Sequence, residues 1–177
     1  MNRHHVRQNY FEFFGLAVNF DISLNALATS YRKIQAEAHP DKFVTASTSE
    51  KMQSMQTATF ANDAYQTLKQ PALRAAYLLS LQGITAISET NTAMPTDFLM
   101  QQMEWRELLE DAIQASNVQA IESLARELKT QENDLQTEFK THFDEKKDFK
   151  SATDIARKLI FIDKVSADTK QALALLD

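Results

Sequence analysis

Apolar residues recur at every third or fourth position along most of this 177-residue chain, which is the spacing of amphipathic helices. In the first half this pattern predicts helices near residues 9–15, 23–38, 48–69 and 72–81. The second of these helices has an apolar set at Leu24, Leu27, Ala28, Tyr31, Ile34 and Ala38. The third runs through Met52, Met55, Thr59, Ala64, Tyr65 and Leu68.

The second half of the chain predicts three further helices, near 97–115, 117–146 and 150–175. The middle one carries an apolar stripe close to heptad spacing, at Val118, Ile121, Leu124, Ala125, Leu128, Leu135, Phe139 and Phe143. Because the connection at Ser116-Asn117 is short, we expect neighbouring helices to pack antiparallel. Gly83 is typical of a helix stop, and the polar residues of 84–95 indicate a loop.

The tripeptide His39-Pro40-Asp41 interrupts the helical pattern. Pro40 must end the preceding helix, since it has no N–H to donate and disfavours the α region at His39. Ser47 and Ser49 then offer start signals for the next helix. A short carboxylate at Asp41, displayed on an exposed turn, suits a charge-assisted bond with an arginine of a partner. Pro40 would limit the entropy lost on docking, and His39 would bond to nearby backbone and hold the turn. A plain solvated turn is the alternative.

Composition narrows the class of protein. The chain is 44% hydrophobic, with two glycines, three prolines and no cysteine. Long helices with short connections fit this composition, and a β-sandwich does not. The absence of cysteine excludes disulfides, thiolate zinc sites and cysteine-ligated iron–sulfur clusters. We therefore expect no metal site and no cofactor. No apolar run is long enough to span a membrane, and a cytoplasmic setting is compatible with the missing cysteines.

Charge differs between the two halves. Residues 1–82 hold eight Lys/Arg and six Asp/Glu, whereas residues 83–177 hold eleven and eighteen. The balances of +2 and −7 suggest two surfaces with different partners. Acidic helices that merely keep the protein in solution are an equal alternative. The distribution argues against nucleic acid, which requires a concentrated basic stripe.

His39 and Asp41 could in principle belong to a catalytic or metal site. Metal catalysis usually requires three protein ligands, and nucleophilic catalysis requires an activated nucleophile. No third member can be placed near this pair, and His142 falls in a different predicted helix. A hydrolase that uses His39 is therefore the weakest interpretation, and we expect no enzymatic activity.

Two helices place apolar residues away from their core stripes. In the helix near 97–115, Phe98, Trp105, Leu109, Ala112 and Ile113 share one face, while Met100 and Met103 lie opposite among Glu104, Glu107 and Asp111. In the last helix Ala152, Ile155, Ala156, Leu159 and Ile162 share a face, and Phe161 points nearly opposite with Arg157 on its flank. These residues predict a binding surface. The alternative for the helix near 97–115 is burial on two sides, with the two methionines against a neighbouring helix or the N-terminal domain. The alternative for Phe161 is an inter-domain contact.

Several sequence blocks in order resemble a J-domain. The blocks are Asn9-Tyr10-Phe11-Glu12-Phe13-Phe14-Gly15-Leu16, Tyr31-Arg32-Lys33, His39-Pro40-Asp41-Lys42-Phe43, Asn62-Asp63-Ala64-Tyr65-Gln66-Thr67-Leu68, and then Pro71, Arg74, Ala75 and Tyr77. The chain continues past Tyr77 with Leu78-Leu79-Ser80-Leu81-Gln82-Gly83, and later with the segments 98–104 and 157–164. That combination resembles the HscB family, the J-type co-chaperones of iron–sulfur cluster assembly.

The resemblance implies an all-α, L-shaped protein. It implies a J-domain over 1–83, built as an antiparallel helical hairpin with the HPD loop, an inter-domain loop over 84–95, and a three-helix scaffold-binding domain over 96–177. It also implies two partners and no active site. One partner is a DnaK-like chaperone of the HscA type, whose ATPase the J-domain stimulates. The other is an iron–sulfur scaffold protein of the IscU type, which the C-terminal helices deliver.

The family's functional residues carry over by position. The chaperone-binding set is Tyr31, Arg32, Lys33, His39, Pro40, Asp41 and Lys42, on a basic face that is thin here because Glu37 interrupts it. The scaffold-binding set is Leu99, Met100, Met103, Glu104, Glu107, Asp111 and Phe161. Two further interpretations stay open: a J-domain protein that delivers a different client, and a helical structural adaptor without chaperone activity.

Overall fold

The structure is a computed structural model that describes residues 8–87 and 93–176. Within these residues every regular element is helical, which confirms the all-α prediction. The chain forms two compact units, residues 1–74 and 75–177. The division falls inside α4 (Pro71–Leu81), nine residues before the domain end predicted at Gly83. Ala75, Leu78 and Leu79, which are fully buried, fall within the second unit.

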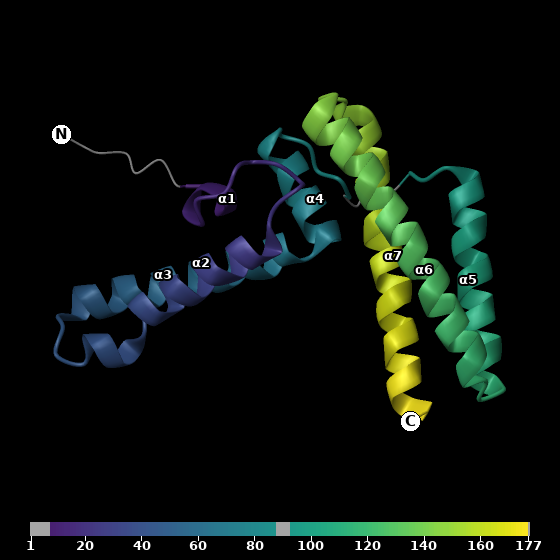
Figure 1. Cartoon of the computed structure of the whole chain (residues 1–177), viewed down its shortest axis with the longest axis horizontal. Coiled ribbons are helices and arrows are strands. Elements are labelled where there is room, and N and C mark those ends of the chain that lie inside the picture. The colour runs from purple at the N-terminus through teal and green to yellow at the C-terminus, as the bar shows by residue number, and fades with distance from the viewer. Residues whose placement is uncertain (1–7, 88–92, 177) are drawn as a thin grey trace. The chain divides into compact units, whose positions relative to one another are not determined.

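The first unit is built around an antiparallel pair of helices, α2 (Leu24–Glu37) and α3 (Thr48–Lys69), which lie side by side in Figure 1. Each starts at a serine cap: the Ser23 hydroxyl accepts from Ala26 N, and Ser47 forms a capping box with Glu50. The same bonds from Ser47 lower the pKa of the Glu50 carboxyl. These caps explain why the predicted starts at 23 and 48 were nearly right.

A short helix, α1 (Tyr10–Phe13), covers part of this pair and is briefer than the predicted 9–15. Gly15, at φ +68°, turns the chain out of the helix in a conformation that other residues rarely adopt. Tyr10 and Phe13 each make edge-to-face contact with Phe60 of α3. The fully buried side chains of the unit are Phe11, Leu27, Ala61, Ala64 and Leu68.

The apolar pattern of α3 does not follow burial along the whole helix. Met52 and Met55 belong to the predicted apolar set, yet both side chains are exposed. α1 contacts α3 at Phe60, two turns beyond Met52, so this first part of α3 is packed against α2 and η1 on one side only. The periodicity therefore predicted the helix correctly. It was wrong in predicting that Met52 and Met55 would be buried.

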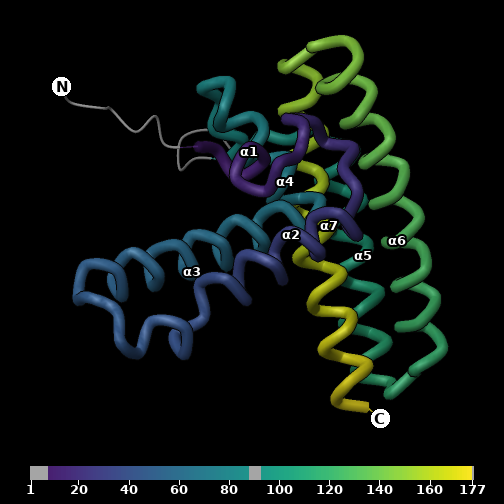
Figure 2. The backbone as a smooth tube through the Cα atoms, turned by 60° about the vertical axis from the view of Figure 1, so that its left-hand side comes forward, coloured from purple at the N-terminus to yellow at the C-terminus, as the bar shows by residue number. Residues whose placement is uncertain are grey.

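The second unit contains the three predicted C-terminal helices, α5 (Thr96–Gln114), α6 (Val118–Lys140) and α7 (Phe149–Leu176). All three lie side by side in Figures 1 and 2, with α6 antiparallel to the other two. Asn117 caps α6 by accepting from Ala120 N, and Ser116 before it has φ +49°. This two-residue reversal is the short connection that the sequence predicted.

The core of the second unit follows the predicted stripes closely. The α6 stripe is buried at Ile121, Leu124, Leu128, Leu135 and Phe139, and the α7 stripe at Ala152, Ile155, Ala156, Leu159 and Ile162. On α5, Trp105, Leu109 and Ala112 are buried as expected, but Ile113 is 42% exposed. Ile113 lies in the last turn of α5 at the border of the buried face, so its assignment to the core was wrong.

The predicted helix 117–146 changes geometry before its end. Its last part, η2 (Thr141–Glu145), is a π-helical turn in which Phe143 is buried and stacks on Phe139. Lys147, at φ +55°, then reverses the chain. Asp148 holds the reversal, since its N–H donates to His142 O, its carboxylate pairs with His142 Nδ1 at 3.2 Å, and the same carboxylate accepts from Ser151 N in α7.

Candidate partner-binding surfaces

The HPD tripeptide opens a short 3-10 helix, η1 (Pro40–Phe43), between α2 and α3. His39 is its N-cap: Nδ1 accepts a hydrogen bond from Asp41 N at 3.3 Å, as the sequence predicted for this side chain. Pro40 occupies the first helical position, where its missing N–H costs nothing. The Asp41 side chain is 88% exposed, with its carboxylate 3.5 Å from His39 Nδ1. The turn therefore displays a carboxylate on a backbone that two neighbouring residues fix.

A buried serine ties this turn to α3. Ser54 Oγ donates to the carbonyl oxygen of Ala38 at 2.7 Å, at the point where α2 ends. Both residues are buried. The bond satisfies a carbonyl that the helix end leaves unpaired and fixes where the turn begins. Sequence analysis missed Ser54, because a serine in mid-helix usually faces solvent and its partner is sixteen residues away.

A groove of about 500 Å³ lies beside the HPD turn. Its lining comes from α2, η1 and α3 and includes His39, Pro40, Phe43, Val44 and Met55. Val44 and Met55 are both 68% exposed, so the border of the groove is apolar. The first unit thus combines one exposed carboxylate with an adjoining apolar depression.

The predicted chaperone-binding residues of α2 differ in how accessible they are. Arg32 and Lys33 are exposed, and Lys42 in η1 is exposed as well. Tyr31 is instead half-buried: its ring stacks on Tyr65 at 4.1 Å and its hydroxyl bonds to Asn62 of α3. Tyr31 therefore holds α2 and α3 together, while the three cations face solvent.

The first part of α5 carries the misplaced apolar residues that the sequence singled out. Met100 is 58% and Met103 is 70% exposed, and Leu99 is exposed on the same helix. The carboxylates predicted to accompany them, on Glu104, Glu107 and Asp111, are also exposed. Opposite them, α5 buries Gln102, Trp105, Leu109 and Ala112 against its own unit. Within its own unit α5 is thus buried on one side only.

Phe161 on α7 lies level with this part of α5. Lys158 Nζ sits 5.5 Å from the centre of the Phe98 ring, which fixes the register between the two helices. Because α5 and α7 run in the same direction and Phe161 follows Lys158 by one turn, we place Phe161 near the part of α5 that carries Met100 and Met103. The ring is half-buried, and Lys164 Nζ lies 5.6 Å from its centre. Burial and the carboxylate of Glu132 raise the pKa of the adjacent Asp163.

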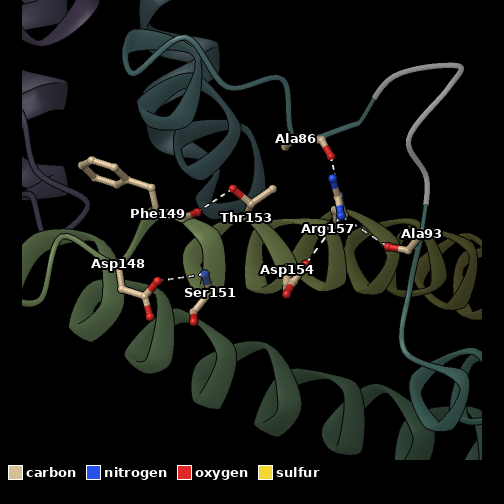
Figure 3. A network of polar contacts seen from close by, with 8 residues as sticks. All are labelled: Ala86, Ala93, Asp148, Phe149, Ser151, Thr153, Asp154 and Arg157. Carbon is tan, nitrogen blue, oxygen red and sulfur yellow. Dashed lines mark hydrogen bonds and ion pairs between the residues drawn. The ribbon is translucent and has the colours of Figure 1, made fainter.

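Arg157, which the sequence placed on the flank of Phe161, is a buried structural residue instead. Figure 3 shows its guanidinium between α7 and the segment that leads into α5. Nε donates to Ala86 O at 2.6 Å, and Nη1 donates to Ala93 O at 3.4 Å and lies 3.5 Å from Asp154. The side chain is therefore not available to a partner. Sequence reasoning could not assign this role, since the two alanines lie 71 and 64 residues away.

The described residues show neither a metal-binding cluster nor a membrane-spanning helix. No group of three or more His, Asp or Glu side chains there is arranged to hold a metal ion. No helix in the described part of the chain has the length and hydropathy needed to cross a membrane.

Comparison with known proteins decides the family. A curated co-chaperone protein HscB homolog from Cupriavidus taiwanensis is 40% identical over 172 residues, which cover 97% of each chain. The chain belongs to the HscB family of co-chaperones. A second HscB homolog, from Paraburkholderia phymatum, is 42% identical and covers 97% of this chain and 98% of its own length. A family model described as the HSCB C-terminal oligomerisation domain matches residues 94–170.

Solved HscB structures share the fold. The chaperone HscB from Vibrio cholerae superposes with a TM-score of 0.83 at 35% identity, covering 96% of this chain and all of the other. The human co-chaperone protein HscB gives a TM-score of 0.86 at 28% identity, covering 97% of this chain and 85% of its own. The helical hairpin with the HPD turn is thus the J-domain of an HscB protein, and α5 to α7 are its C-terminal helical domain.

Proposed function

We propose that this HscB-family protein stimulates the ATPase of a DnaK-like chaperone of the HscA type and delivers to it an iron–sulfur scaffold protein of the IscU type. The single observation that carries the first part is the HPD turn. A cap from His39 and the ring of Pro40 hold the backbone, and Asp41 is left 88% exposed. A fixed and exposed carboxylate is ready to bond with an arginine of the chaperone at little entropic cost.

The surroundings of Asp41 suit docking of a chaperone. Arg32, Lys33 and Lys42 are solvent-exposed cations that would guide the approach of an acidic surface. Glu37 is exposed on the same helix and weakens this positive field. We therefore assign the three cations a modest effect on the association rate. The apolar groove at Val44 and Met55 offers contact area next to the carboxylate.

The scaffold is assigned to the apolar residues of α5 and the adjoining aromatic of α7. Met100 and Met103 present flexible, polarizable side chains to solvent, which suits a binding surface. Phe161 stands at their level on α7, and the exposed carboxylates of Glu104 and Glu107 border the apolar area. The scaffold supplies the cluster ligands, since this chain has no cysteine.

The test of the proposal is the ATPase rate of an HscA-type chaperone, measured alone, with this protein, and with an IscU-type scaffold added. We expect stimulation by the wild-type protein and a further increase with the scaffold. Asp41→Asn should abolish stimulation, because the neutral amide loses the charge-assisted bond, while Asp63→Asn on exposed α3 should not. Both variants should keep wild-type helicity, since neither side chain is in the core.

The outcomes separate this proposal from its rivals. Stimulation without capture of the scaffold would indicate a J-domain protein that delivers a different client. No stimulation by a folded wild-type protein would indicate a helical adaptor. Full stimulation by the Asp41→Asn protein would show that the HPD turn is not the docking element.

A further inference from the structure

A large apolar residue of α5 lies outside the predicted scaffold-binding set. Leu108 is 55% exposed, about as much as Met100. It does not belong to the buried face of α5, which consists of Gln102, Trp105, Leu109 and Ala112. A leucine exposed singly is common, so its position relative to the other exposed residues decides whether it has a role.

Leu108 adjoins the carboxylates of the predicted surface. It follows Glu104 by four residues and precedes Asp111 by three, so it lies about one turn from either of them, roughly 6 Å and roughly 4.5 Å along the axis. Leu99, Met103, Met100 and Leu108 then succeed one another around the exposed side of α5 over about half of its circumference. The predicted scaffold-binding residues of α5 run from Leu99 to Asp111, so Leu108 lies within the part of the helix that they cover.

The charge around Leu108 indicates what could cover it. α5 carries five acidic side chains and one basic one, Arg106. Two of the acids, Glu104 and Asp111, are exposed neighbours of Leu108 at helical spacing, and Glu107 precedes it directly in the chain. An apolar side chain among carboxylates fits a partner whose apolar contact is bordered by lysine or arginine, because like charges would be repelled.

We propose that Leu108 is a further contact residue of the scaffold-binding surface, and that it meets an apolar part of the scaffold next to basic side chains. This inference rests on the proposed function, because it takes the same scaffold protein as the occupant. It extends the surface around α5 beyond Met100, on the side where Glu104 and Asp111 lie.

Ile113 provides a matched control on the same helix. It is also a large aliphatic residue and 42% exposed, but it lies on the opposite border of the buried face and past Asp111. The experiment measures binding of an IscU-type scaffold to the full-length protein by calorimetry, for the wild type and for Leu108→Ala, Leu108→Met, Ile113→Ala and Met103→Ala. Unfolding of each protein is followed by the fluorescence of Trp105, the single tryptophan.

We expect Leu108→Ala to weaken binding about tenfold, as truncation of an interface anchor does, and Leu108→Met to stay near wild type. Ile113→Ala should change the dissociation constant less than about twofold. If Met103→Ala weakens binding and Leu108→Ala does not, the inference is overturned while the proposed function stands. If neither weakens binding, the proposed surface fails and the inference fails with it. Equal losses for Leu108→Ala and Ile113→Ala, or a lower melting temperature with unchanged binding, would also overturn the inference.

Discussion

His39, Ser54 and Arg157 each hold a connecting segment through a hydrogen bond to its backbone. His39 accepts from Asp41 N and fixes the HPD turn, and Ser54 donates to Ala38 O at its base. Arg157 donates to the carbonyls of Ala86 and Ala93. The Ser54 bond satisfies a carbonyl at the end of α2 that has no helical partner, and the Arg157 bonds hold the segment between α4 and α5. Single residues therefore set the conformation of two segments, the HPD turn and the connection that leads into α5.

The strongest prediction at this scale concerns Arg157. Replacing it by alanine leaves the buried Ala86 O without its charged donor and removes the weaker bond to Ala93 O, which should lower the free energy of unfolding by about 2–3 kcal/mol. Urea unfolding followed by Trp105 fluorescence measures the loss in the second unit. Arg106→Ala, which removes an exposed arginine of α5, should change stability by less than about 0.5 kcal/mol. A similar small change for Arg157→Ala would contradict the assigned role.

These residues also mark the limit of sequence reasoning at residue scale. The bond of His39 was predictable because its partner, Asp41, is two residues away. The exposure of Met100 and Met103 followed from their angular position on a predicted helix. The burial of Arg157 and the stacking of Tyr31 on Tyr65 could not be predicted, because both depend on segments brought together by the fold.

At the scale of elements, caps and reversals determine where the helices begin and end. Ser47 with Glu50 starts α3, Asn117 starts α6, and Asp148 accepts from Ser151 N at the start of α7. The sequence predicted the starts of α2, α3 and α6 to within one residue, because cap side chains are local signals. It wrongly predicted that the side chains of Met52 and Ile113 would be buried. Periodicity gives the direction of a side chain on its helix, but it does not show whether another element packs against that side.

The start of α7 should give a pH-dependent contribution to stability. The bonds from Ser151, and then the pairing with His142, lower the pKa of Asp148 from its ordinary value of 3.8. A carboxyl with a lowered pKa stabilises the folded state above its unfolded pKa, and this contribution is lost as pH falls through the folded pKa. Asp148→Asn should therefore melt at a lower temperature than wild type near pH 7, and the difference should shrink below about pH 4.

Thermal unfolding of both proteins, followed by Trp105 fluorescence between about pH 2 and about pH 7, checks this prediction. His142→Gln in the same series separates the smaller contribution of the histidine from that of Ser151. A melting-temperature difference that stays constant over the whole range would show that the charge of Asp148 is irrelevant to the cap.

At the scale of the whole molecule, the protein divides into units of opposite charge. Residues 1–82 carry a net +2 and residues 83–177 a net −7. The sign change was visible in the sequence and pointed to two surfaces. The compact units divide inside α4, between Arg74 and Ala75, whereas the sequence placed the end of the first domain at Gly83. The helical pattern is continuous over 72–81, so it does not show which unit each turn of this helix packs with. The end of the first domain was therefore predicted at the next glycine, Gly83.

The burial of α4 leads to a test with two fragments. Leu78 and Leu79 are fully buried and group with the second unit, so a fragment of residues 75–177 should fold and keep Trp105 buried. A fragment of residues 84–177 lacks both leucines and should be less stable by about 4 kcal/mol or more, since each buried leucine contributes at least about 2 kcal/mol. Urea unfolding of the two fragments, followed by Trp105 fluorescence, gives the difference.

In the full chain, Leu79→Ala should lower the stability of the second unit, while Leu81→Ala, at an exposed position of the same helix, should not. Equal stability of the two fragments would mean that the leucines of α4 serve the J-domain core, and the border at Gly83 would then be correct.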